Sequence, residues 1–191
     1  MATNEHTFKL VIVGDAAVGK TSLITQFATR KFHKEYLQTI GCQLNVAELN
    51  VGDVLIRLVI WDLAGQPRFQ SVRTLYFVGS DAAIVVYDVS RRSTFENVDG
   101  WLMALKRAVP DKIPMVLVAN KVDLASQRVV TAKEGEQACL GHEFDAYLET
   151  SARTGENVGE LFDTVTRLLI QDRLTELRER LTPFLYTSFA S

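Results

Sequence analysis

The residue types best suited to chemistry lie in one short string, GDAAVGKT, at positions 14–21. Gly14 and Gly19 bracket four residues and precede Lys20 and Thr21, which is the spacing of a phosphate-binding loop. In such a loop, Lys20 supplies positive charge to the outer phosphates, and the Thr21 hydroxyl is suited to binding Mg²⁺. The residues expected to hold phosphate are Asp15, Ala16, Ala17, Val18, Gly19, Lys20, Thr21 and Ser22.

The elements that must position this loop flank it in the sequence. Residues 8–13, FKLVIV, are apolar apart from Lys9 and half of them are β-branched, as in a buried parallel strand, and a helical pattern follows Thr21. A strand, a tight loop and a helix place successive backbone N–H groups and a positive helix end around an anion. The same glycines without these neighbours would indicate only a turn, so the flanking pattern favours phosphate binding.

A second string, NKVD at 120–123, is suited to reading a purine base. It follows the apolar run 114–119, and ligands bind where the strands of an open α/β sheet end. The Asp123 carboxylate can accept from the ring N–H and the exocyclic amine of guanine, whereas adenine presents acceptor atoms there. The string therefore indicates guanine, although NKVD alone is also consistent with a solvated turn. The residues expected at the base include Asn120, Lys121 and Asp123.

Residues TSAR at 150–153 provide a further piece at the base end. They follow the strand-like run 144–149. The Ser151 hydroxyl and the Ala152 N–H are expected to buttress Asp123 and to contact the base oxygen, with Arg153 beside them. A helix-capping turn is the alternative interpretation. The pattern gains weight only because NKVD precedes it.

The residues between these two ends are suited to sensing a third phosphate. In WDLAGQ at 61–66, Asp62 is expected to hold Mg²⁺ through water, while the Gly65 N–H meets the γ-phosphate. Gln66 is the candidate for orienting an attacking water, and with Lys20 it forms the expected catalytic pair. Thr39 offers a second hydroxyl to the metal. Phe32 is placed to lie against the guanine ring or to act as a local hydrophobic plug.

With these motifs in order, the chain resembles a Ras-superfamily small GTPase, most like the Rab branch. The likeness runs from about residue 8 to residue 169 and includes IG at 40–41, WDLAGQ, YDVS from Tyr87, NKVD and TSARTGENV at 150–158. The resemblance implies a GTP/GDP switch in membrane-traffic-type or other signalling regulation that binds Mg²⁺ and slowly hydrolyses GTP. It also implies activating, exchange and effector proteins as partners, and two switch segments around Thr39 and Gln66.

Some positions depart from the pattern of relatives. Leu44, Trp61 and Tyr76 fall where Rabs carry an aromatic triad that effectors read, but Leu44 replaces the usual Phe. Ala16 adds a methyl near the position that an activator's arginine must reach. Pro67 fixes its own φ and is expected to stiffen the second switch. No arginine is recognisable from sequence as completing the charge stabilisation in cis, so an activating partner is expected.

The strand-like runs predict an α/β chain with the P-loop NTPase fold. They alternate with helical patterns, except for the second and third runs, which the turn at 51–53 joins as a hairpin. We therefore predict a six-stranded, mostly parallel sheet with helices on both faces. The runs lie at about 8–13, 42–50, 54–61, 82–88, 114–119 and 144–149.

Composition is ordinary for a globular domain. The 191 residues are 47% hydrophobic and 23% charged, and the net charge is −2, which predicts no general attraction to nucleic acid. The two cysteines, Cys42 and Cys139, have no metal-ligand spacing and suit a reducing compartment. No signal peptide and no membrane-spanning apolar run are recognisable, so a cytoplasmic location is expected.

The C-terminal region departs from the Rab pattern. No cysteine follows Cys139, so no lipid anchor is expected. A last helix is predicted to reach about residue 180, within a GTPase domain of 1–182 and before a short apolar tail at 183–191. Its apolar stripe is expected to fold back on its own domain. A helix or tail that docks on a partner or makes peripheral membrane contact is the alternative. The stripe comprises Ile170, Leu174, Leu177 and Leu181.

Two other functions share some of these motifs. One is a guanine-nucleotide-binding interaction module that never cycles, which Ala16, Pro67 and the absent lipid site favour. The other is a P-loop kinase or ATPase, which shares GDAAVGKT at 14–21. Asp123 argues against the second, as does the lack of an evident site for an acceptor substrate.

Overall fold

The computed structural model describes residues 4–29, 41–65, 70–109 and 112–187, with the side chains of residues 4, 70–73 and 176–187 left undescribed. Strands and helices alternate along this part of the chain. The strands are β1 (Asn4–Val13), β2 (Cys42–Val51), β3 (Val54–Leu63), β4 (Ala82–Asp88), β5 (Met115–Asn120) and β6 (Ala146–Thr150). The helices are α1 (Lys20–Thr29), α2 (Gln70–Phe77), α3 (Arg92–Glu96), α4 (Val98–Ala108), the 3₁₀ turn η2 (Ala125–Gln127), α5 (Ala132–Gly141) and α6 (Val158–Thr187).

The strands form one sheet in the order β2-β3-β1-β4-β5-β6. β1 runs parallel to β3 and β4, and β5 runs parallel to β4 and β6, while β2 is antiparallel to β3. The β2–β3 pair is the predicted hairpin, in which Val51 faces Val54 and Gly52 adopts the positive φ of 59° that a tight hairpin turn needs. The predicted six-stranded, mostly parallel sheet is confirmed.

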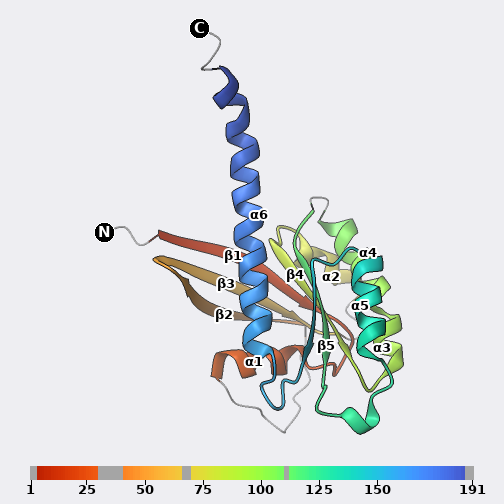
Figure 1. The fold of residues 1–191 in the computed structure, drawn as a ribbon. Coiled ribbons are helices and arrows are strands. Elements are labelled where there is room, and N and C mark those ends of the chain that lie inside the picture. Colours follow the sequence, from red (N-terminus) through yellow and green to blue (C-terminus); the bar gives the residue numbers. More distant parts are fainter. Residues whose placement is uncertain (1–3, 30–40, 66–69, 110–111, 188–191) are drawn as a thin grey trace.

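Both faces of the sheet are buried beneath helices. Alternate residues of β1 point to opposite faces, so Leu10 and Ile12 enter one hydrophobic cluster while Val11 and Val13 enter the other. Phe162 of α6 lies in the first cluster and Trp101 of α4 in the second. Figure 1 shows α1 and α6 on one face of the sheet and α2 to α5 on the other. This two-sided burial explains why the central strands β4 and β5 read as continuous apolar runs.

The strand bounds agree with the predicted runs to within a few residues, except at the start of β1. The strand begins at Asn4 because its first residues pair with β3, with Asn4 opposite Val54. Those early positions are polar and therefore gave no hydrophobic signal. Because β1, β3, β5 and β6 are parallel to one another, their carboxyl ends meet at one edge of the sheet. The segments that carry the predicted site follow at this edge.

Helix α6 is longer than predicted. Its 30 residues end at Thr187 rather than near residue 180, and at 1.5 Å per residue they span about 45 Å. Leu169 is buried, but Leu174 is 51% exposed, and Figure 1 shows the later turns extending beyond the sheet. The prediction that the apolar stripe packs against its own domain is therefore wrong at Leu174, because α6 extends past the ends of the strands that it covers. No helix in the described part of the chain is long and apolar enough to cross a bilayer.

Candidate functional site

The loop between β1 and α1 has a backbone that only a few residue types accept. Gly14 and Gly19 have φ values of 138° and 103°, and Ala17 has a φ of 62°, in the left-handed region. A Cβ on Gly14 would lie 2.1 Å from the carbonyl oxygen of Val86. A Cβ on Gly19 would lie 2.3 Å from Asn120 Nδ2. The two glycines of the motif are therefore required both by conformation and by space.

Lys20 is folded over this loop. It is the first residue of α1 and is 6% exposed. Its Nζ donates to the carbonyl oxygens of Gly14 at 2.8 Å and Asp15 at 2.9 Å. A charged ammonium this deeply buried is held by acceptors of the loop itself, which fixes its position. The charge that was predicted to serve the outer phosphates is therefore already located at the loop.

Two of the predicted metal ligands meet in the structure. Asp62 is the second-last residue of β3 and is fully buried, and its Oδ2 accepts a hydrogen bond from Thr21 Oγ1. Mg²⁺ prefers oxygen ligands and often takes only one or two from protein side chains. A hydroxyl and a carboxylate brought together from α1 and β3 fit this preference. The donor set is thus suitable for Mg²⁺.

Gly65 lies directly against the phosphate loop. A Cβ at this position would lie 2.3 Å from the carbonyl carbon of Asp15 and 2.4 Å from the backbone nitrogen of Ala16. Only glycine fits so close an approach of two backbones. The predicted residues Phe32, Thr39 and Gln66 lie outside the described residues.

Asn120 ties the base end of the site to the phosphate loop. It is the last residue of β5, and its Nδ2 donates to the carbonyl oxygen of Val18 at 2.8 Å. Its Oδ1 accepts from Thr150 Oγ1 at 3.2 Å and from the Ala152 N–H at 3.1 Å. One buried amide therefore joins segments that follow β1, β5 and β6. Sequence reasoning placed Asn120 at the base but did not reveal this joining role.

Asp123 is held where its carboxylate can face a ligand. Its Oδ1 accepts from Ser151 Oγ at 2.7 Å, the contact expected from the sequence. Arg153 Nη1 lies 3.6 Å from its Oδ2. The Ala152 N–H, by contrast, donates to Asn120 and not to Asp123, which corrects that part of the expectation. The TSAR segment at 150–153 therefore orients Asp123 through Ser151.

Lys121 is paired with a buried carboxylate that sequence reasoning missed. Its Nζ lies 2.7 Å from Oδ2 of Asp88, the last residue of β4. Burial alone would raise the pKa of Asp88, but the hydrogen bonds from Lys121 and Ser90 outweigh it and hold this pKa below its usual 3.8. Arg91 Nε also donates to Asp88 Oδ2, at 3.0 Å. Asp88 lies in the motif YDVS, which the sequence analysis used as a sign of family membership and not as part of the site.

The outer side of the phosphate loop is contacted by the α3–α4 region. Asn97 Nδ2 donates to Asp15 Oδ2 at 2.8 Å, and Trp101 Nε1 donates to Asp15 Oδ1 at 2.9 Å. Arg91 Nη2 donates to the carbonyl oxygen of Ala16 at 2.8 Å. No local motif marked these three residues, because they lie more than 70 positions from the loop. Asp15 is therefore oriented by side chains and is directed outward, toward α4.

The predicted effector triad forms a continuous surface. Leu44 of β2 lies opposite Trp61 of β3 and is 57% exposed. The ring centroids of Trp61 and Tyr76 are 5.9 Å apart. The three residues thus adjoin one another across β2, β3 and α2.

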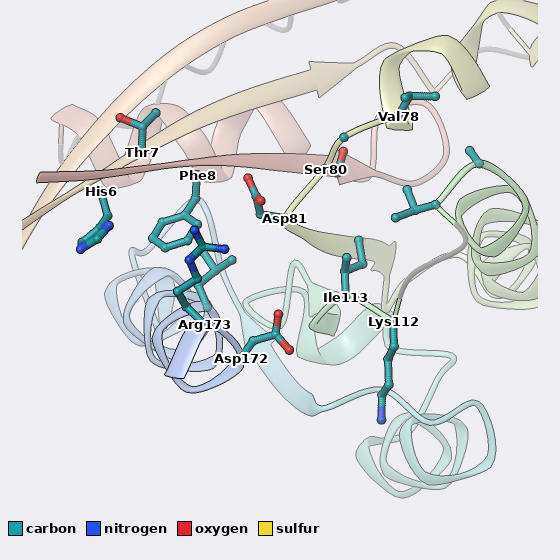
Figure 2. A pocket seen from close by; sticks show the side chains of 14 residues that line it. His6, Thr7, Phe8, Val78, Ser80, Asp81, Lys112, Ile113, Asp172 and Arg173 are labelled. Carbon is teal, nitrogen blue, oxygen red and sulfur yellow. The ribbon is translucent and has the colours of Figure 1, made fainter. Parts of the chain in front are cut away.

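A separate hollow of about 480 Å³ lies at the opposite end of the sheet. Figure 2 shows Phe8 from β1, Asp81 from the segment before β4, Ile113 from the segment before β5, and Asp172 and Arg173 from α6 around it. These positions are near the amino ends of β4 and β5. The hollow is therefore distinct from the candidate nucleotide site at the carboxyl edge.

Comparison with known proteins gives a consistent result. Residues 9–171 match the Ras family. The chain is 40% identical over 176 residues to the Ras-related protein Rab-7a of Dictyostelium discoideum, covering 90% of this chain and 87% of that protein. It is 38% identical over 173 residues to the Ypt/Rab-type GTPase ypt7 of Schizosaccharomyces pombe, covering 88% and 84%. It is 35% identical over 163 residues to the Ras-related protein Rab-13 of Rattus norvegicus, covering 85% and 80%.

Proposed function

The chain belongs to the Ras family as a Rab-like GTPase, and we propose that the carboxyl edge of its sheet holds one molecule of GTP with Mg²⁺. The observation that carries this proposal is the position of Asn120. Its side chain bonds the phosphate loop at Val18 and the base-end segment at Ala152. Because one side chain spans both, the two loops are close enough to bind opposite ends of a single nucleotide.

The phosphate end accounts for the chemistry of hydrolysis. Backbone N–H groups of the loop and the Lys20 ammonium bind the phosphate oxygens and stabilise the charge that develops on them. Thr21 and Asp62 hold Mg²⁺, which when bound neutralises charge on the outer phosphates. Gln66 orients a water for in-line attack on the γ-phosphate. Thr39 supplies a further hydroxyl to the metal, as the family resemblance implies.

The base end accounts for specificity. The Asp123 carboxylate, oriented by Ser151, accepts from the ring N–H and the exocyclic amine of guanine. Adenine offers no donors at these positions, so its binding would leave Asp123 without the two hydrogen bonds that guanine supplies. Phe32 lies against the base in this proposal. The same residues argue against a P-loop kinase or ATPase.

We infer that the protein acts as a switch in membrane-traffic-type regulation, read by an effector through Leu44, Trp61 and Tyr76. The segments around Thr39 and Gln66 are ordered by the γ-phosphate and released after hydrolysis. Activating and exchange proteins are the proposed partners, because hydrolysis without a donated arginine is slow in this class of enzyme. The later turns of α6 are a candidate contact for a partner or a membrane surface.

A single-turnover assay of bound GTP tests the hydrolytic part of the proposal. Wild-type protein is expected to convert bound GTP to GDP slowly, and Gln66→Leu to do so at least tenfold more slowly. GTP affinity should stay within about twofold, because Gln66 acts on the water and not on the ground-state nucleotide. Equal rates in the two proteins would remove Gln66 from the mechanism. No hydrolysis by wild type would instead support a non-cycling binding module.

A further inference from the structure

Arg91 links the phosphate loop to the base end of the site through one carboxylate oxygen. Its Nη2 donates to the carbonyl oxygen of Ala16 at 2.8 Å, and its Nε donates to Asp88 Oδ2 at 3.0 Å. The same Oδ2 lies 2.7 Å from Lys121 Nζ. The Asp88 side chain is 1% exposed, so the Arg91–Asp88 ion pair is anchored in the protein interior at Asp88. A chain of charged contacts therefore runs from Lys121 to the outer side of the loop.

The contact at Ala16 fixes the orientation of a whole peptide group. The Ala16 carbonyl and the Ala17 N–H belong to one peptide bond, and in a planar trans peptide these two groups point in opposite directions. Arg91 holds the oxygen on the outer side of the loop. The Ala17 N–H must then point to the inner side, where successive N–H groups bind an anion.

The loop does not favour this orientation by itself. Ala17 has a φ of 62°, a left-handed conformation that an alanine adopts at an energetic cost. Rotation of the Ala16–Ala17 peptide would bring Ala17 back to negative φ and would turn its N–H away from a bound anion. A bond that holds the Ala16 oxygen in place opposes this rotation.

We propose that Arg91 is a positioning residue that keeps the Ala16–Ala17 peptide turned toward bound nucleotide and thereby slows nucleotide release. The inference rests on the proposed function, because it presupposes that the loop binds phosphate. Arg91 acts through the loop and does not itself contact the nucleotide. Its role complements that of Lys20, which binds the loop carbonyls of Gly14 and Asp15.

The adjacent arginine offers a matched control. Arg92 Nη1 donates to Glu134 Oε1 at 2.6 Å, and its Nη2 donates to the carbonyl oxygen of Val129. It therefore points toward α5, away from the phosphate loop. The side chains of Arg91 and Arg92 are equally exposed, at 41% each. Replacing either arginine with alanine removes the same charge and the same length of side chain, but only Arg91→Ala removes the hydrogen bond to the Ala16 oxygen.

The first test is the rate at which a fluorescent GDP derivative leaves the full-length protein. Arg91→Ala is expected to raise this rate about tenfold, the size expected for loss of one charge-assisted hydrogen bond. Arg92→Ala should stay within about twofold of wild type. Arg91→Lys should be intermediate, because an ammonium lacks the planar fork that reaches two acceptors. The ³¹P resonance of the bound β-phosphate should shift in Arg91→Ala and not in Arg92→Ala.

A second variant separates positioning from general stability. Glycine accepts positive φ without strain, so in an Ala17→Gly background the peptide has less tendency to rotate. Arg91→Ala should then raise the release rate by only about twofold. An undiminished tenfold effect in that background, or an equal effect of Arg92→Ala, would overturn the inference.

If wild-type protein retains no guanine nucleotide, the proposed function itself fails. If wild type retains nucleotide and Arg91→Ala releases it at the wild-type rate, only the role of Arg91 fails.

Discussion

The two ends of the candidate site are built in different ways. The phosphate loop presents backbone groups, and its shape depends on the positive φ values of Gly14, Ala17 and Gly19. The base end presents side chains, and its geometry depends on hydrogen bonds to Asn120 and Asp123. Phosphate is recognised by many N–H groups at once, whereas a base is recognised by the edge of one ring.

This difference has a consequence for mutation. At the phosphate end, a change matters if it alters backbone shape or removes Lys20, and it affects every nucleotide alike. At the base end, a change matters if it alters the donor and acceptor pattern, and it affects one base more than another. Asp88 lies between the two ends, where it pairs with Lys121 of the base end and with Arg91, which bonds the phosphate loop.

Removal of Lys20 should give the largest effect and should not depend on the base. In Lys20→Ala, two loop carbonyls lose their donor and the phosphates lose a buried positive charge, so affinity for GTP and GDP is expected to fall at least about hundredfold. Titration with fluorescent nucleotides measures this loss. Lys106→Ala, an exposed lysine of α4, is the control and should bind normally. Unchanged affinity in Lys20→Ala would contradict its role at the phosphates.

A change at Asp123 should give a smaller and base-specific effect. Asp123→Asn is expected to weaken GTP binding by about 10- to 100-fold, because a charged acceptor of two hydrogen bonds becomes an amide. It should also improve binding of xanthosine triphosphate, whose ring carries a carbonyl where guanine carries the amine. Competition between the two nucleotides is the measurement, with Asp99→Asn of α4 as control. An equal loss of affinity for GTP and for xanthosine triphosphate would show that Asp123 does not contact the base.

Asp88 should give the smallest effect of the three, and one that varies with pH. Because its pKa is lowered in the folded protein, the charged form stabilises the fold above the unfolded pKa near 4, and this stabilisation is lost as pH falls through the folded value. Asp88→Asn should lower the free energy of unfolding by about 1 kcal/mol at pH 7.

The pH profile distinguishes this role of Asp88 from simple packing. Below pH 4 the unfolding free energies of wild type and Asp88→Asn should converge, as followed by urea denaturation across pH 2.5–7. Asp163→Asn, on the exposed side of α6, should track wild type throughout. A gap between Asp88→Asn and wild type that stays constant with pH would mean that the ion pairs do not carry the effect.

The sequence predicted the sheet and the segments of the site because both depend on local patterns. Apolar runs reported the buried strands, and the glycine spacing at 14 and 19 reported a loop whose backbone is restricted. The contacts of Asp15 with Asn97 and Trp101 could not be predicted, because they arise only when α4 packs beside the loop. The length of α6 was underestimated because its later turns extend beyond the sheet (Figure 1), where the pattern of buried strands gives no guide to the end of a helix.

The most direct test of the central claim is a crystal structure of the protein with a non-hydrolysable GTP analogue and Mg²⁺. One analogue molecule should span the carboxyl edge of the sheet, with its phosphates against Lys20 and the loop and its guanine edge on Asp123. Phosphates at Lys20 with the base turned away from Asp123, or two molecules in separate cavities, would contradict the account.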